Sequence, residues 1–317
     1  MKWINPSGIV IACCCAVITV GVFYAQTAED TQERDLAPNG RGIGTEFAHG
    51  PSSHRSGPMR LNKSQKSASG NGIYYHGGPL LGIAGAPSAY LIWYGNWSGN
   101  TATSILTNFV LHVGGSPYFN INTTYYDGTG NYVTNAIRYG GTTTDNYSHG
   151  TALSDSAVQA VVAQAISSGK LPTDPDGVYF VLTSKDVDET SGFCTSYCGW
   201  HTYGTISGSN IKYAFIGNGD RCPSACEEQT KSPNGNSGAD GMASVLAHEL
   251  EEAVTDPNLN AWYDRRGEEN ADKCAWTFGA TSTANNGSMY NMILNGKPYL
   301  IQQNWVNASG GYCAMSY

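Results

Sequence analysis

DGMASVLAHELEEAVTDP, residues 240–257, is the stretch that decides the fold of this sequence. Its composition predicts a helix with Asp240 as the N-cap residue and an end near Thr255, before an Asp-Pro pair. Apolar residues recur at helical spacing between positions 243 and 254, so one face of the helix can pack against a core. The opposite face carries ionisable side chains, which determine what the segment can do.

His248 and Glu252 are four residues apart and therefore lie on one face of this helix. Both side chains are good ligands for zinc or a similar divalent ion. Glu249 occupies the position of the general base in the H-E-x-x-H arrangement of zinc peptidases. The segment thus predicts a zincin-like active-site helix, with Glu249 as the catalytic residue.

A catalytic zinc needs a third protein ligand, and an acidic cluster that follows the helix offers several. Glu269 is the preferred third ligand, with Glu268 and Asp264 as alternatives. Asp272 is expected to orient His248 from outside the ligand set or to replace one of the ligands. Because two carboxylates and one imidazole form a hard, negative site, calcium or manganese is an alternative to zinc.

The same helix has a plainer interpretation, a solvated acidic face on which Glu249, Glu251 and Glu252 are surface charges. Two further histidines, His76 and His201, are flanked by aromatic residues and glycine and are candidates for lining a cleft. For each of them the alternative is a buried ring that bonds a backbone carbonyl. The sequence therefore leaves open whether the chain is an enzyme.

Strand and helix signals alternate through the rest of the chain. Runs of β-branched and aromatic residues predict strands at 89–97, 178–183, 211–216 and 299–306. Helices are predicted at 101–113 and after Ser154, which is a suitable N-cap. The combination indicates a single α/β or α+β domain with a mixed sheet and flanking helices.

The first 70 residues are interpreted as lying outside the folded domain. A mostly apolar, charge-free stretch at 8–24 follows Lys2 and predicts a signal peptide over residues 1–25, with an uncleaved anchor helix as the alternative. Residues 26–70 lack apolar periodicity and predict a disordered leader or propeptide. Residues 71–317 then form the folded domain.

Composition favours an exported protein. Charged residues are only 13% of the 317, and the net charge is -8 without a basic cluster, which argues against nucleic-acid binding. No phosphate-cradling loop is present, so no nucleotide cofactor is expected, and no membrane association is expected after signal cleavage. The cysteines beyond the signal peptide are Cys194, Cys198, Cys222, Cys226, Cys274 and Cys313. They predict three disulfides, although the sequence does not determine which cysteines pair. A four-thiolate zinc site is the alternative.

Several motifs together resemble the exordium, or phosphate-induced protein 1, family. They are YYHGGPLL (74–81), FCTSYCGWHTYG (193–204), RCPSAC (221–226), residues 240–257, ENADKCAW (269–276) and LIQQNWV (300–306). The resemblance implies secretion to the plant cell wall or apoplast and a role in brassinosteroid-responsive growth, but it supplies no reaction. His248, Glu249 and Glu252 match the family's H-E-L-x-E segment, whereas Asp264 departs from its plant members.

Two functions follow from these observations. The first is a secreted, zincin-like metal-dependent hydrolase that acts on peptides. The second is a non-catalytic secreted module that binds a cell-wall component, a glycan or a receptor. In the second case exposed tryptophans could stack on sugars, and the candidates are Trp93, Trp97, Trp200 and Trp262.

Overall fold

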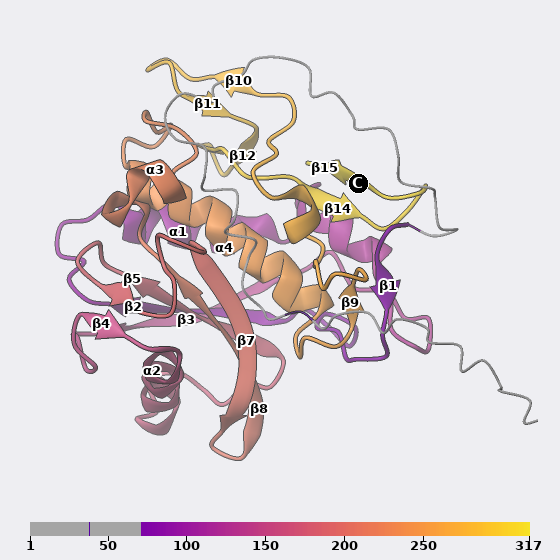
Figure 1. Ribbon diagram of the computed structural model, residues 1–317, viewed down its shortest axis with the longest axis horizontal. Helices are drawn as coiled ribbons and strands as arrows, with labels where there is room; N and C mark the ends of the chain where they lie inside the picture. Colours follow the sequence, from indigo (N-terminus) through magenta and orange to yellow (C-terminus); the bar gives the residue numbers. More distant parts are fainter. Residues whose placement is uncertain (1–37, 39–70) are drawn as a thin grey trace, which may run out of the picture. The chain divides into compact units, whose positions relative to one another are not determined.

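The computed structural model describes residue 38 and residues 71–317, and these residues belong to one compact unit (Figure 1). The predicted signal peptide and nearly all of the predicted leader lie outside the described residues. Within the described part of the chain, no helix combines the length and the apolar composition needed to cross a bilayer.

A mixed five-stranded sheet forms the centre of the fold, as the sequence predicts. Its strands, in spatial order, are β3 (Arg138–Asp145), β2 (Ser88–Tyr94), β5 (Gly177–Thr183), β8 (Ser209–Ile216) and β7 (Gly199–Ile206). Neighbouring strands are parallel except β7, which runs antiparallel to β8 at the edge of the sheet. Every residue of β2 and β5 is buried, because both faces of the sheet are covered.

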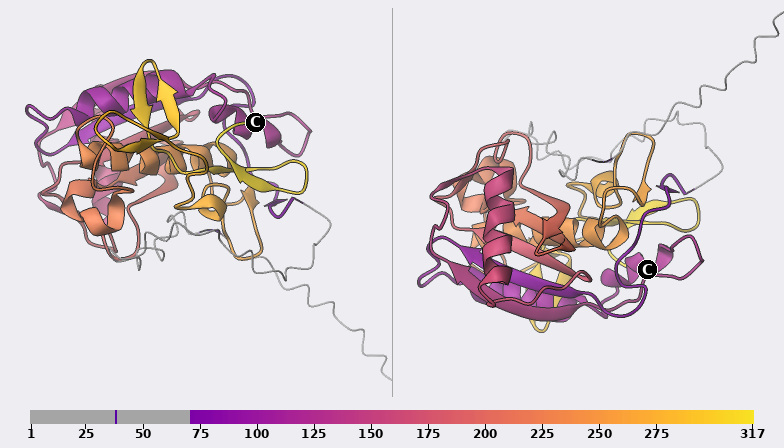
Figure 2. Two further views of the ribbon diagram at one scale, coloured as in Figure 1. Left: turned by 90° about the horizontal axis from the view of Figure 1, so that it is seen from above. Right: turned by 90° about the horizontal axis from the view of Figure 1, so that it is seen from below.

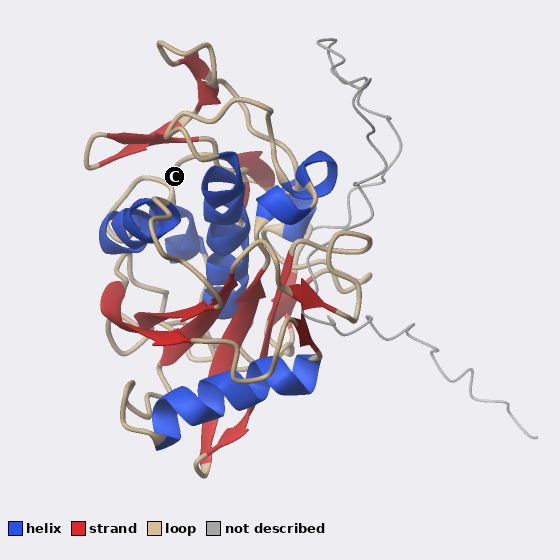
Figure 3. Cartoon of the chain, turned by 90° about the vertical axis from the view of Figure 1, so that its left-hand side faces the viewer, coloured by secondary structure: helices blue, strands red, loops and turns tan. Residues whose placement is uncertain are grey.

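Helices cover the two faces of the sheet (Figure 3). The α-helices are α1 (Ala102–Val113), α2 (Asp155–Ser167), α3 (Pro223–Cys226) and α4 (Ser237–Thr255), and the short 3₁₀ helices are η2 (Phe119–Thr124), η3 (Gly219–Arg221) and η4 (Asp272–Cys274). The long helix α4 packs on β5, β7 and β8 and also contacts α1, whereas α2 packs on β5 and β8 from the other face. The side chain of Ser154 caps α2 as predicted, accepting a hydrogen bond from the Ala157 amide at 3.2 Å.

Short strand pairs complete the fold. They are β1 (Tyr74–Tyr75) with β9 (Trp262–Tyr263), β4 (Ala152–Leu153) with β6 (Asp188–Glu189), β10 (Ser282–Thr283) with β11 (Met289–Tyr290), β12 (Met292–Leu294) with β13 (Lys297–Tyr299), and β14 (Asn304–Val306) with β15 (Tyr312–Ala314). The C-terminal hairpins lie on the side of α4 away from the sheet (Figures 1 and 2). As a result α4 is enclosed on both sides, which places its ionisable face inside the protein.

The single strand predicted at 299–306 is wrong, because β13 ends at Tyr299 and β14 begins at Asn304. The backbone amides in between bond to scattered partners instead of one neighbouring strand. Ile301 donates to the Asn291 side chain at 2.9 Å, and Gln302 donates to the Ser244 hydroxyl at 3.2 Å. This irregular segment lies along α4 and brings the Gln302 side chain to His248.

The predicted start of α4 is also wrong. The helix begins at Ser237, and the N-cap is Asn236, whose side-chain oxygen accepts a hydrogen bond from the Ala239 amide at 3.1 Å. The Asp240 carboxylate instead accepts hydrogen bonds from the backbone and side chain of Asn234, at 3.0 and 2.6 Å. A capping asparagine four residues upstream therefore displaces the predicted aspartate cap.

The three predicted disulfides are present, as Cys194–Cys222, Cys198–Cys226 and Cys274–Cys313. The first two run side by side from the segment before β7 to the segment that includes α3. Because these bonds use all four cysteines of the two Cys-x-x-x-Cys pairs, the alternative of a four-thiolate zinc site is wrong. The third bond ties the acidic segment after α4 to β15.

Candidate functional site

The ionisable face of α4 is buried. His248 is 5% exposed, Glu249 1% and Glu252 0%, and Glu251 on the other side of the helix is also fully buried. The interpretation of this face as a solvated acidic surface is therefore wrong. Burying an ionised carboxylate is costly unless a positive charge or hydrogen-bond donors accompany it, so the partners of these side chains decide what the site can do.

One group of potential ligands forms around His248. The Nε2 atom of His248 lies 2.9 Å from Glu252 Oε1 and 3.4 Å from Asp272 Oδ1. We call His248, Glu252 and Asp272 the His248 group; its ligand atoms all lie within 4.8 Å of one another. The Asp272 amide donates to Glu252 Oε1 at 3.1 Å, and this bond fixes the start of η4 against α4.

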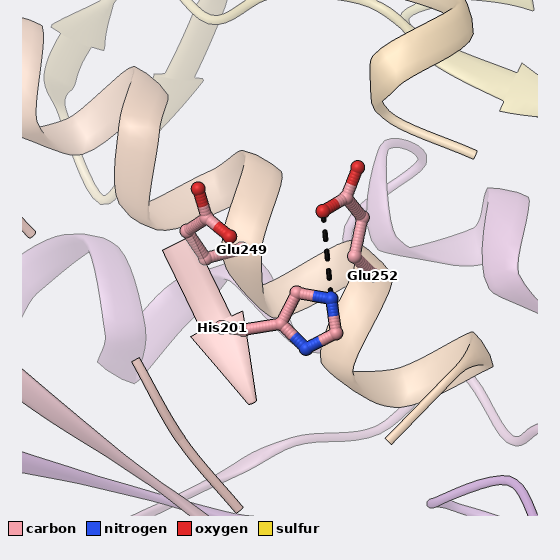
Figure 4. Close-up of side chains that lie close together, drawn as sticks. All are labelled: His201, Glu249 and Glu252. Carbon is pink, nitrogen blue, oxygen red and sulfur yellow. Dashed lines mark ion pairs between the residues drawn. The ribbon is translucent and has the colours of Figure 1, made fainter. Parts of the chain in front are cut away.

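A second group forms around His201, which β7 carries over α4 (Figure 4). His201, Glu249 and Glu252 offer ligand atoms within 4.8 Å of one another, and we call them the His201 group. The His201 Nε2 atom lies 3.6 Å from Glu252 Oε2 and 3.2 Å from both carboxylate oxygens of Glu269. Glu252 therefore belongs to both groups and directs one oxygen to each histidine.

The structure thus brings together most of the predicted ligands in an arrangement that differs from the predicted one. Asp272, expected to orient His248 or to replace one of the ligands, contacts His248 directly, whereas Glu269, the preferred third ligand, contacts His201 instead. His201 was only a candidate for lining a cleft. Its position beside the carboxylates could not be predicted, because the sequence did not predict β7 as a strand.

Burial and mutual repulsion act on the carboxyl groups of the cluster. Burial, followed by the nearby Asp272 carboxylate, raises the pKa of Glu252 to about 7. Burial also raises the pKa of Glu249 and of Glu269 well above the ordinary value, and in both cases the Glu252 carboxylate adds to the increase. Ionising these groups together is unfavourable unless a positive charge enters the cluster.

The two histidines do not supply that charge in full. Burial, and then the proximity of His248, lowers the pKa of His201 to about 3, so His201 is neutral. Burial would also lower the pKa of His248, but the Glu252 and Asp272 carboxylates outweigh it and raise that pKa well above the ordinary value. A single imidazolium thus faces four carboxyl groups, and this excess of acid over base favours a bound cation.

The geometry of the His248 group fits such a cation. Ligand atoms about 2.1 Å from a tetrahedral zinc are roughly 3.4 Å apart, close to the 2.9 and 3.4 Å that separate His248 Nε2 from its two carboxylate neighbours. Within residues 71–317, Glu249 Oε2 and Glu252 Oε2 accept no hydrogen bond. Buried oxygens without donors are destabilising, and they are the ligands that hard divalent cations prefer.

Gln302, which the sequence did not single out, contacts the second ring nitrogen of His248. Its Nε2 atom contacts His248 Nδ1, and its Oε1 accepts a hydrogen bond from the Trp276 amide at 3.1 Å. With the amide in this orientation Nδ1 would have to accept, which only a neutral His248 with its proton on Nε2 can do; the imidazolium donates from both nitrogens and needs the Gln302 oxygen at Nδ1. Metal binding at Nε2 requires the other tautomer, with the Gln302 amide rotated so that its oxygen accepts the Nδ1 proton.

The remaining candidate ligands lie outside both groups. Asp264 forms an ion pair with Lys273 at 3.2 Å, and Glu268 forms one with Arg266 at 2.6 Å. Although burial opposes it, hydrogen bonds from the Arg266 and Glu268 amides and the charge of Lys273 hold the pKa of Asp264 below its ordinary value. His76 stacks on Tyr263, with ring centroids 3.5 Å apart.

Other polar and aromatic residues around α4 have structural roles. Glu251 Oε2 accepts a hydrogen bond from Asn304 Nδ2 at 2.8 Å, and burial raises the pKa of this carboxyl group well above its ordinary value. The four tryptophans considered for stacking on sugars are all 9% exposed or less. They pack in the core, so the prediction that they form a glycan-binding surface is wrong.

Replacing Gly199 by alanine is expected to lower the free energy of unfolding by about 1–3 kcal/mol. A Cβ atom here would lie 2.5 Å from Val245 Cγ1 and 2.9 Å from the Phe215 carbonyl oxygen, so β7 would have to move away from α4. Urea denaturation measures the change, with Thr205→Ala on the exposed part of β7 as the control. A loss below about 0.5 kcal/mol would contradict this close packing.

Comparison with known proteins agrees with the resemblance seen in the sequence. A family model described as "Phosphate-induced protein 1 conserved region" matches residues 73–314. Protein EXORDIUM-like 3 of Arabidopsis thaliana is 33% identical over 281 residues, which cover 76% of this chain and 82% of the relative. Protein EXORDIUM-like 5 of the same plant is 34% identical over 235 residues, covering 65% of this chain and 64% of the relative.

A third relative, Protein PHOSPHATE-INDUCED 1 of Nicotiana tabacum, is 28% identical over 228 residues, covering 63% of this chain and 69% of the relative. No solved structure gives a significant match. The family model covers the whole sheet, α4 and every member of the two ligand groups. The chain therefore belongs to the phosphate-induced protein 1 (exordium) family.

Proposed function

We propose that this protein is a secreted, metal-dependent hydrolase that cleaves extended peptides. The observation that carries the proposal is the buried His248 group, in which one imidazole nitrogen faces two carboxylates at 2.9 and 3.4 Å. Glu249 lies beside it on the same helix with a carboxylate oxygen that accepts no hydrogen bond within residues 71–317. This combination supplies both a cation site and a proton acceptor.

Each side chain has a role in this hydrolysis. A divalent cation, with zinc as the first choice and manganese or calcium as alternatives, would supply Lewis acidity for activating water. Glu249 accepts a proton from the attacking water and returns it to the leaving nitrogen as the hydroxyl adds to the carbonyl carbon and the amide bond breaks. Burial raises the pKa of Glu249, and a cation nearby would lower it and leave the carboxylate able to act as a base.

The edge strand β7 supports an extended peptide as the substrate. Cys198 and Ile206 lie at hydrogen-bonded pairs with β8, because the Gly217 amide donates to the Cys198 carbonyl at 3.0 Å and Ile206 pairs with Ser209 across a two-residue turn. Hydrogen-bonded pairs alternate along an antiparallel ladder, so the amide and carbonyl of His201 point outward. His201 itself is 1% exposed, so a peptide that adds to this edge as a further strand would pair at the exposed Tyr203 and Thr205, two and four residues along β7 from His201.

Export is part of the proposal. Three disulfides form and persist in oxidising compartments, and they fit a protein that works outside the cell. The family includes proteins of plants, and a secreted enzyme there would meet peptides of the cell wall or apoplast. A non-catalytic binding module is the alternative function.

Glu249→Gln is expected to keep the metal of the His248 group and to slow peptide hydrolysis by about 10² to 10⁴-fold, because only the proton acceptor is lost. The purified protein and the variant would be tested by elemental analysis and with a library of extended peptides. Glu251→Gln is the matched control, since it makes the same change on the same helix but faces Asn304 instead of the cluster.

The outcomes separate the two functions. A stoichiometric metal and hydrolysis that depends on Glu249 would support the enzyme. Metal without hydrolysis of any peptide in the library, in a folded protein, would favour the non-catalytic module. A folded protein that binds no zinc, manganese or calcium would rule out the proposed mechanism.

A further inference from the structure

We propose that the cluster binds two divalent cations, with Glu252 bridging them. The first cation is held by the His248 group, and this part rests on the proposed function. The second is held by His201 Nε2, Glu252 Oε2 and the carboxylate of Glu269, so that His201 is a metal ligand from a different element of the fold.

The distances around His201 repeat those around His248. His201 Nε2 lies 3.2 Å from Glu269 and 3.6 Å from Glu252 Oε2, against 2.9 and 3.4 Å in the His248 group. All four distances lie close to the spacing of about 3.4 Å between ligands of one tetrahedral ion. The two oxygens of Glu252 face different histidines, which is the geometry of a bridging carboxylate.

Charge balance also calls for two cations. Glu249, Glu252, Glu269 and Asp272 carry four negative charges when ionised, and all four side chains are less than a tenth exposed. Two divalent ions with two neutral imidazoles balance these charges, whereas one ion leaves two negative charges buried without compensation. An uncompensated buried charge is strongly destabilising, so the second ion follows from the same physics as the first.

The hydrogen-bond inventory is consistent with this occupancy. Within residues 71–317, the buried Glu252 Oε2 has no hydrogen-bond partner, and the 2.9 Å contact of His248 Nε2 with Glu252 Oε1 is an ion pair without hydrogen-bond geometry. A set of four carboxylates and two imidazoles is also typical of dinuclear iron and manganese sites. Two adjacent ions can stabilise both the attacking and the leaving atoms of a hydrolysis, which would make His201 and Glu269 part of the machinery.

Metal stoichiometry tests the inference. The purified protein, stripped with a chelator and reloaded with an excess of Mn²⁺ or Zn²⁺, is expected to retain two equivalents after desalting. His201→Ala and Glu269→Gln should each retain one equivalent, and Glu249→Gln should retain two. His112→Ala is the control, because His112 bonds the Asn108 carbonyl within its own helix, α1, and its loss should leave two equivalents in place.

Electron paramagnetic resonance of the Mn²⁺-loaded protein gives an independent readout. The parent should show the spectrum of an exchange-coupled pair, and His201→Ala the spectrum of an isolated ion. One equivalent in the parent, unaffected by His201→Ala, would overturn the second site and leave the proposed function standing. One equivalent lost in both His201→Ala and His248→Ala would overturn it in favour of one shared ion. No metal in the folded parent would overturn both proposals.

Discussion

Glu252→Gln is expected to stabilise the metal-free protein and to destabilise the metal-loaded protein. Without metal, at pH 8, the variant should be more stable than the parent by on the order of 3 kcal/mol, because it removes a buried charge. With zinc or manganese the parent should become the more stable protein, because it binds the ions and the variant does not. Metal at 1,000 times its dissociation constant adds about 4.1 kcal/mol to the parent, which exceeds the metal-free difference.

The pH dependence of the metal-free difference follows from the pKa of Glu252. This pKa is raised from 4.5 to about 7 in the folded protein by burial and by Asp272. The contribution of the protonated group to stability is therefore fully present below pH 4.5 and lost as the pH rises through 7. Glutamine does not titrate, so parent and variant should be nearly equal at pH 4 and diverge between pH 4.5 and 7.

Urea denaturation at pH 4 and pH 8, with chelator or with metal, measures all four conditions. Glu251→Gln is the control: it also removes a buried carboxyl group of raised pKa from α4, but its stability should not depend on metal. If Glu252→Gln destabilises the chelated protein at pH 8, the cluster is stable without a cation and the electrostatic argument fails.

The sequence predicted those strands whose own residues carry a clear apolar pattern. The strands at 178–183 and 211–216 are runs of apolar residues, and the structure buries them in the centre of the sheet. β3 was missed because its sequence, RYGGTTTD, has small and polar residues. Its strand conformation comes from parallel pairing with β2, a contact between residues distant in the chain. β7 was missed for a similar reason, since it includes two glycines and depends on antiparallel pairing with β8.

The sequence predicted which residues make up the candidate site but not which of them contact one another. Helical spacing places His248 and Glu252 on one face, and the acidic segment after α4 supplies the remaining carboxylates. Spacing cannot show that Asp272 and Glu269 contact different histidines, because that depends on η4 and on the position of β7. The buried state of the whole face was equally out of reach, since it arises from hairpins that lie up to sixty residues further along the chain.

Removing the disulfide between Cys274 and Cys313 is expected to destabilise the protein by about 4 kcal/mol. This bond closes a loop of 39 residues, and the chain-entropy cost of releasing a loop of that size is about 4 kcal/mol. Cys274 ends η4, and Asp272 begins it, so the same change should weaken metal binding by the His248 group. The double variant Cys274→Ala/Cys313→Ala, followed by urea denaturation and metal titration, tests both effects.

The matched control is Cys194→Ala/Cys222→Ala, which should cost much less, about 1 kcal/mol. Its loop spans 28 residues, but Cys198–Cys226 spans the same number four residues further on and still closes nearly the same loop. The unfolded chain therefore gains little freedom when only one of these two bonds is removed. Equal losses in the two double variants would show that loop closure does not set the contribution of these disulfides. An unchanged metal affinity in Cys274→Ala/Cys313→Ala would show that Asp272 is held in place without this disulfide, by contacts that include its bonds to Glu252 and Glu269.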